Sequence, residues 1–186
     1  MNNGDIILLL LLVGAFIVGF VWGTARSLIF LGGGALVFLI AAHARAPLSG
    51  FLVQQWGNLD PSFNDMVSML VLYGLGLVAL LGIVWFGAKN TGLSQRAPDL
   101  DRLLGGLVAV GCTVMIIGGL AAALSLYYDP GAGPAQTGGV DWADSLHRGV
   151  MGSEIGAAIN RSLLPALGSI VGPLLPVGFE EAFGAA

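Results

Sequence analysis

The sequence has 186 residues, of which 56% are apolar and only 10% carry a charge. A soluble domain of this size has about 25% charged residues, so this chain has too little charge to cover a water-facing globule. Its single cysteine excludes a disulfide framework and a cysteine-rich metal site. The net charge of −4 argues against nucleic-acid binding, which needs a basic surface. Together these features indicate an integral membrane protein.

Four stretches without formally charged residues predict four membrane-spanning helices. They cover residues 6–25, 27–44, 66–88 and 103–128. A helix needs about 20 apolar residues to cross a bilayer, and runs of this length without alternation exclude barrel strands. We therefore expect an all-α integral membrane protein with a four-helix transmembrane domain over residues 1–128.

The first two predicted helices follow one another almost without a loop. Gly19 and Gly23 permit a tight reversal, and Arg26 sits where the chain would meet the lipid headgroups. A single kinked helix would overrun the bilayer, so a hairpin is favoured. A cleavable signal peptide is disfavoured because no basic residue precedes the first apolar run.

The segment between the second and third spans contains apolar residues at helical spacing. They are Leu48, Phe51, Leu52, Trp56 and Leu59. This pattern, with Pro47 in the first turn, predicts a short interfacial helix on the membrane surface. A loop packed on the bundle fits the pattern equally well. Asp60 and Pro61 then suit the cap and first turn of the third helix.

Residues 129–186 form a Gly-rich, acidic tail of irregular structure. Its last apolar stretch, residues 162–179, is interrupted by Pro165, Pro173 and Pro176. Each proline removes a helix hydrogen bond, so a fifth straight span is disfavoured and an interfacial or re-entrant segment is expected.

Basic residues near the span ends predict the orientation. Arg26, Lys89, Arg96 and Arg102 share one side of the membrane, whereas only Arg45 lies close to a span on the other. Because basic residues stay cytoplasmic, we expect both termini on the non-cytoplasmic side.

The sequence offers little that could carry chemistry. No predicted span contains a formally charged residue, which argues against a proton-coupled transporter. No nucleophile and base form a recognisable set, so no catalytic, cofactor-binding or metal-binding residue is predicted. His43 is expected at the interface and Cys112 within helix packing. Asp99 or Asp101 is expected to cap the fourth helix.

Small residues recur at four-residue spacing and predict close helix contacts. The candidate packing positions are Gly19, Gly23, Gly105, Ala109, Gly118 and Ala122. Such faces let helices approach closely, either within this protein's own bundle or against a partner helix.

Several residues together resemble the colicin V production protein family, which comprises CvpA-like bacterial membrane proteins. The matching positions are Asp5, Gly23, Arg26, His43, the TGLS segment of residues 91–94, Asp101, Arg102, Gly105, Trp142 and Ser145. The chain departs from the family at Trp22, Ser27 and Cys112, where many members carry charged residues. The resemblance implies a multi-pass protein of the bacterial cytoplasmic (inner) membrane, associated with toxin production or export and envelope homeostasis, without an established biochemical activity.

From these observations we expect a non-enzymatic scaffold or accessory subunit of a cytoplasmic-membrane complex. Its partners would be the lipid bilayer and other membrane proteins, or further copies of itself, through small-residue helix packing. The alternative is a small oligomeric channel or export component lined by Ser, Thr and Gly.

Overall fold

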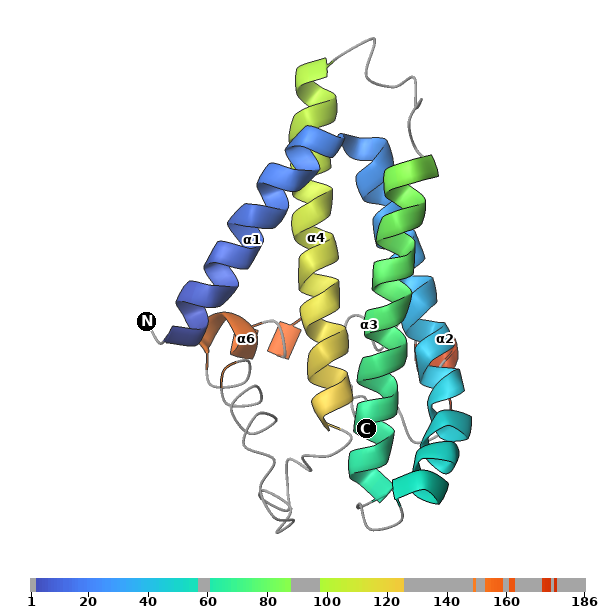
Figure 1. Ribbon diagram of the computed structural model, residues 1–186. Helices are drawn as coiled ribbons and strands as arrows, with labels where there is room; N and C mark the ends of the chain where they lie inside the picture. Colours follow the sequence, from blue (N-terminus) through green and yellow to red (C-terminus); the bar gives the residue numbers. More distant parts are fainter. Residues whose placement is uncertain are drawn as a thin grey trace.

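The computed structural model describes residues 3–56, 61–87, 98–125, 149, 153–158, 161–162, 172–174 and 176. Figure 1 shows four long helices, α1 (Asn3–Trp22), α2 (Thr24–Trp56), α3 (Pro61–Gly87) and α4 (Pro98–Ser125). The short helix α6 (Glu154–Ala158) and a 3₁₀ turn, η3 (Gly172–Leu174), follow. No strand occurs within these described ranges.

All four long helices are long and apolar enough to cross a membrane. Only 17% of the most apolar part of α1 is buried, and even in α4 the share is 44%. The remaining apolar surface suits lipid rather than water. The expectation of four such helices is confirmed.

The helices α3 and α4 each begin five residues before the span that the sequence predicts, at Pro61 and Pro98. Proline suits the first helical turn because its missing N–H needs no partner there. The charged residues of these first turns therefore belong to the helices, at their outer ends.

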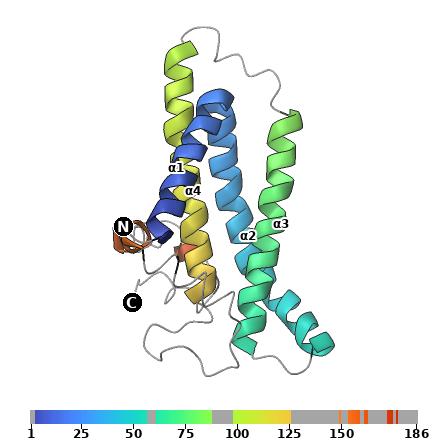
Figure 2. The same cartoon turned by 60° about the vertical axis from the view of Figure 1, so that its left-hand side comes forward.

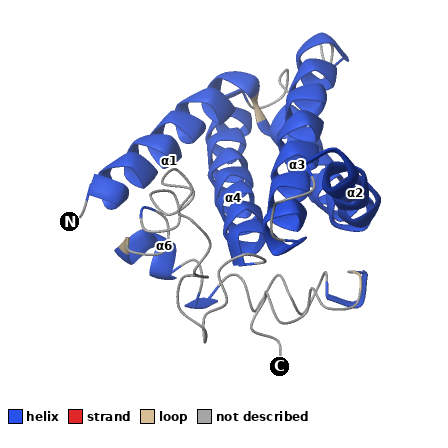
Figure 3. Ribbon diagram, turned by 60° about the horizontal axis from the view of Figure 1, so that its bottom comes forward, coloured by secondary structure: helices blue, strands red, loops and turns tan. Residues whose placement is uncertain are grey.

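Helix α4 occupies the centre of the bundle. It packs against α1 and against α2, while α3 packs mainly on α2. In Figure 3, α4 lies between α1 and the pair formed by α2 and α3. The largest core cluster joins α2, α3 and α4, where the Phe38 and Tyr73 rings meet edge to face at 5.6 Å. Three small side chains, Ala121, Ala122 and Ala123, let α4 approach this aromatic pair.

The predicted reversal between the first two helices is present, with a different geometry from a packed hairpin. α1 and α2 diverge from the turn, and α4 fills the space between them (Figure 1). Only Gly23 lies in the turn, whereas Gly19 belongs to α1 and faces α4. The apolar pattern could not distinguish these two uses of glycine.

Helix α2 continues through Pro47 to Trp56 instead of ending before a separate interfacial helix. Figure 2 shows its last turns bending away from the bundle. Pro47 has no N–H for the carbonyl of His43 and its ring crowds that carbonyl, so the helix bends without ending. Placement of these turns on a membrane surface stays a prediction.

Several predicted features lie outside the described residues. They are most of the tail 129–186 and of the segment 162–179, the loop with Lys89, Thr91–Ser94 and Arg96, and the residues Trp142 and Ser145.

Candidate functional site

The turn between α1 and α2 depends on one glycine. Gly23 has a φ of 79°, a left-handed conformation that other residues adopt at a cost. Its N–H continues the α1 pattern by donating to the Gly19 carbonyl at 2.8 Å. A Cβ at this position would lie 2.5 Å from Oδ2 of Asp101. Gly23 is therefore required both for the backbone conformation and for the close approach of α4.

Asp101 of α4 caps the N-terminus of α2. The backbone N–H of Thr24 donates to Oδ1 of Asp101 at 3.1 Å, and the Thr24 hydroxyl donates to the Asp101 backbone carbonyl at 2.7 Å. The first N–H groups of a helix have no partner within it and carry partial positive charge, so a carboxylate stabilises them. The sequence predicts Asp99 or Asp101 as the cap of α4; the structure places the Asp101 carboxylate on α2 instead, 77 positions away in the sequence.

Backbone contact between α1 and α4 lies directly beside this cap. A Cβ on Gly105 would lie 2.5 Å from the Gly19 carbonyl oxygen and 2.8 Å from the Gly23 Cα. A Cβ on Gly19 would collide with Gly105 and with the side chain of Ala109. The structure thus brings together four of the predicted packing positions, and the two helices touch through their main chains. We call the set Gly19, Gly23, Thr24, Asp101, Gly105 and Ala109 the helix junction.

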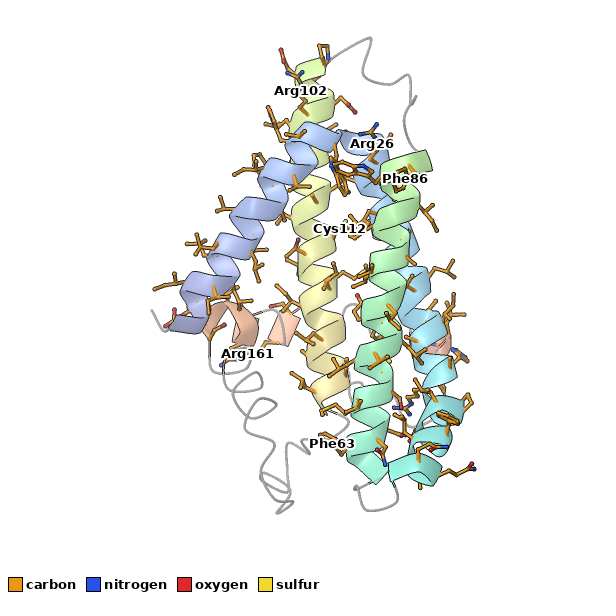
Figure 4. All side chains as sticks on the ribbon, viewed as in Figure 1. Arg26, Phe63, Phe86, Arg102, Cys112 and Arg161 are labelled. Atoms are coloured by element: carbon orange, nitrogen blue, oxygen red, sulfur yellow. The ribbon has the colours of Figure 1, made fainter. Side chains whose placement is uncertain are left out.

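The helix junction lies at the basic end of the molecule. Figure 4 shows Arg26 and Arg102 at this end, together with Phe86. The Trp22 ring packs edge to face on Phe30 at 6.2 Å and on Trp85 at 6.4 Å, which links α1, α2 and α3. Tryptophan and arginine at one end of a membrane helix are typical of the lipid–water interface.

A second carboxylate cap holds α6 at the opposite end. Asp5 of α1 is buried, and its Oδ1 accepts the Ile155 N–H of α6 at 3.3 Å. Ser153 precedes α6, and its hydroxyl oxygen accepts the Gly156 N–H at 2.7 Å. The buried side chain of Leu8 meets Ile117 of α4, with Ile155 packed against both. Asp5, one of the positions that resemble the family, therefore joins the tail to the transmembrane helices.

The remaining predicted residues lie apart from the helix junction. His43 is exposed, and its Nδ1 hydrogen-bonds the Leu39 carbonyl at 2.9 Å. Gly118 is buried in α4, and Ala122 is buried in the core cluster with α2 and α3. Cys112 is buried, and its Sγ donates to the Ser27 carbonyl at 3.5 Å. His43 thus bonds within its own helix, whereas Gly118, Ala122 and Cys112 are packed in the bundle.

The helix junction holds α1, α2 and α4 together: Asp101 and Thr24 cap a helix end, and the glycines and Ala109 allow close packing. Within the described ranges, no three His, Cys, Asp or Glu residues lie close enough to hold a metal ion. Thr24 was not predicted from the sequence, although its two hydrogen bonds to Asp101 form the cap. Its position after Gly23 at a helix start was a usable signal, since threonine is common at such places.

Comparison with known proteins adds a family match. Residues 4–156 match the family described as Colicin V production protein. The matched region covers α2, α3, α4, all of α1 except Asn3, and both carboxylate caps. No curated protein matches the chain. No solved structure matches it.

Proposed function

Since the chain belongs to the colicin V production protein family, we propose that it acts as a non-enzymatic scaffold or accessory subunit of a bacterial cytoplasmic-membrane complex. The proposal is supported by the polar residues of the chain, which form hydrogen bonds between helices. Asp101 and Thr24 join α4 to α2, and Asp5 joins α1 to α6. Such bonds fix the arrangement of helices and so shape the surfaces that they present.

The observation that carries this proposal is that α1 is the least covered long helix, with 17% of its most apolar part buried against 28–44% in the others, and bears an exposed apolar stripe. Side chains three or four residues apart lie on one helix face, and five of them on α1 are between 47% and 76% exposed. The α1 stripe consists of Ile6, Leu10, Val13, Ile17 and Val21. Its helix is held at both ends, by the helix junction and by Asp5, which keeps the stripe turned outward.

A glycine in the middle of α1 makes this surface suitable for a partner helix. A Cβ on Gly14 would meet no atom within 4 Å, so the space beside it is open. Because lipid chains are as apolar as leucine, membrane helices associate through close packing at small residues. The open space at Gly14, beside Val13 of the stripe, offers a small-residue position where a partner helix can pack closely.

Photo-crosslinking in native membranes tests the proposal. A p-benzoylphenylalanine in place of Leu10 is expected to give a covalent adduct with another protein or a second copy of this chain. The matched control replaces Leu75 of α3, which is 65% exposed and lies outside the stripe. Equal adducts at both positions, or lipid adducts alone at Leu10, would contradict the proposal.

For the orientation we propose that the basic end, with Arg26 and Arg102, faces the cytoplasm and both termini face outward. Cysteines replacing Asp99 and Gln54, both exposed, probe the two ends in a Cys112→Ser background. A membrane-impermeant maleimide added to intact spheroplasts is expected to label the Gln54 position alone. Labelling at the Asp99 position alone would reverse the orientation.

A further inference from the structure

The seam between α2 and α3 contains an open apolar groove of about 310 Å³. Two rows of residues at four-residue spacing line it, Gly33, Val37 and Ala41 on α2 and Leu72, Gly76 and Leu80 on α3. Its rim includes Leu36, Ile40 and Ile83, whose side chains are exposed. The groove therefore opens toward the surface that faces lipid.

Glycines bring the two walls of the groove together. A Cβ on Gly33 would lie 2.5 Å from a methyl group of Leu80, and a Cβ on Gly76 would collide with Val37. Leu80 of α3 therefore packs at Gly33 of α2, and Val37 of α2 packs at Gly76 of α3. The row from Gly33 to Ala41 extends about 12 Å along the helix axis, which suits a linear apolar chain lying parallel to the helices.

The same two rows continue into polar residues at one end. One turn beyond Ala41 lies Arg45, and the α3 row continues from Leu72 through Ser68 to Asn64. Because residues four apart are neighbours on a helix surface, these residues lie one or two turns beyond the lining of the groove. A polar end and an apolar length thus share one seam.

Two of these polar side chains are buried without satisfied hydrogen bonds. Asn64 is 1% exposed and Ser68 is 0% exposed. Neither amide atom of Asn64 nor the Ser68 hydroxyl has a hydrogen-bond partner in the part of the chain that the structure describes. A buried polar group without a partner costs about 1–3 kcal/mol, so the two donors among these atoms, the Asn64 amide nitrogen and the Ser68 hydroxyl, suit a bound hydrogen-bond acceptor.

The charge at this end favours an anion of low charge. Burial lowers the pKa of Arg45, and the attraction of the nearby Asp65 carboxylate opposes this by favouring the charged guanidinium. The N-terminus of α3 begins at Pro61 and adds partial positive charge at the same end. The balance suits the single negative charge of a phosphodiester better than the two charges of a phosphate monoester.

We propose that this seam binds one phospholipid. The phosphodiester accepts hydrogen bonds from Asn64 and Ser68 beside the charge of Arg45, and one acyl chain lies in the groove. The polar residues lie one or two turns beyond the groove lining on the same two helices, so the head and one chain of a single amphiphile can reach both parts. This site is independent of the proposed scaffold function and lies on different helices from the α1 stripe.

The test uses the full-length chain, purified and delipidated in detergent, and native mass spectrometry. Titration with phosphatidylglycerol is expected to give a one-to-one complex. Diacylglycerol with the same chains is expected to bind about tenfold or more weakly, because it lacks the charged hydrogen-bond acceptor. Equal binding of both lipids would overturn the headgroup site, and tight binding of inorganic phosphate without lipid would overturn the acyl-chain site.

Variants of the polar end keep the test independent of folding. The double variant Asn64→Leu, Ser68→Ala removes the unsatisfied groups, so it is expected to fold at least as stably as the wild type while binding phosphatidylglycerol about tenfold more weakly. Thr113→Val of α4, which removes a hydroxyl bonded to the Ala109 carbonyl, is the control and should leave lipid binding unchanged. A stable double variant with wild-type lipid affinity would contradict the proposal.

Variants of the groove test the acyl chain separately. Ala79→Leu places a larger side chain in the groove and is expected to weaken lipid binding. Val78→Leu enlarges an adjacent side chain that is 68% exposed and outside the groove lining, and should have no effect. Equal affinities of these two variants would show that the groove holds no acyl chain.

Discussion

The substitution Asp101→Ala removes the carboxylate that caps α2 and leaves the backbone carbonyl that accepts the Thr24 hydroxyl. The Thr24 N–H, bonded at 3.1 Å in a part-buried position, would then lose its acceptor. Loss of a helix N-cap costs about 0.5–2 kcal/mol, and a part-buried N–H left unsatisfied places this case in the upper half of that range. We therefore expect a loss of about 1–2 kcal/mol in the free energy of unfolding.

Two further variants separate the cap from its charge. Asp101→Asn keeps an oxygen that can accept the Thr24 N–H, so it should lose only the interaction of charge with the α2 dipole, about 0.3–1 kcal/mol. Asp99→Ala removes an exposed carboxylate from the same first turn of α4. Its effect should remain within about 0.5 kcal/mol.

Equilibrium unfolding in mixed detergent–SDS micelles, followed by circular dichroism, measures these differences. The expected order of stability is wild type, then Asp101→Asn, then Asp101→Ala, with Asp99→Ala close to wild type. Equal losses for Asp99→Ala and Asp101→Ala would refute the cap, since only charge at the α4 N-terminus would then matter. Equal losses for the Asn and Ala variants would refute the role of the hydrogen bond.

Two other contacts give measurable predictions. Gly105→Ala places a methyl group 2.5 Å from the Gly19 carbonyl and should lower the free energy of unfolding by about 1–3 kcal/mol. In the same assay Gly111→Ala, a substitution on the same helix that enters open space, should leave the free energy of unfolding unchanged. Similar losses for both variants would contradict main-chain contact at the helix junction. Asp5→Ala removes the acceptor of the Ile155 N–H, and because the five residues of α6 are too few to hold a helix alone, amide hydrogen exchange at Ile155 should accelerate. Unchanged exchange there would show that other contacts hold the tail.

The helices and the reversal could be predicted from the sequence because they depend on local properties. Uncharged apolar runs determine where a chain can cross a bilayer, and a glycine between two runs allows a turn. The start of α4 at Pro98 and the continuation of α2 through Pro47 were missed for a related reason. A proline removes one hydrogen bond in either case, and whether the helix begins, bends or ends there depends on the packing around it.

The helix junction could be predicted only in part. The four-residue spacing of Gly19, Gly105 and Ala109 indicates close contact without showing which helices meet. The sequence predicts Asp99 or Asp101 as a cap of the fourth helix because it reveals only neighbours along the chain, whereas the Asp101 carboxylate meets Thr24, 77 positions away.

The polar end of the α2–α3 seam was missed for a different reason. The predicted third span begins at Met66, so Asn64 lies outside it and Ser68 inside it, and no sequence pattern sets either residue apart. Only their burial without hydrogen-bond partners separates them from other polar residues at span ends.

The mass of the protein as it exists in its native membrane tests the scaffold proposal most directly. Extraction of the tagged chain with a membrane-solubilising polymer keeps neighbouring proteins in place, and native mass spectrometry then measures the assembly. We expect a protein mass above the 19.0 kDa of one chain, from another subunit or a second copy. This additional mass should be lost when Gly14 is replaced by Leu, which fills the open space on α1. A single chain accompanied only by lipid would contradict the scaffold proposal.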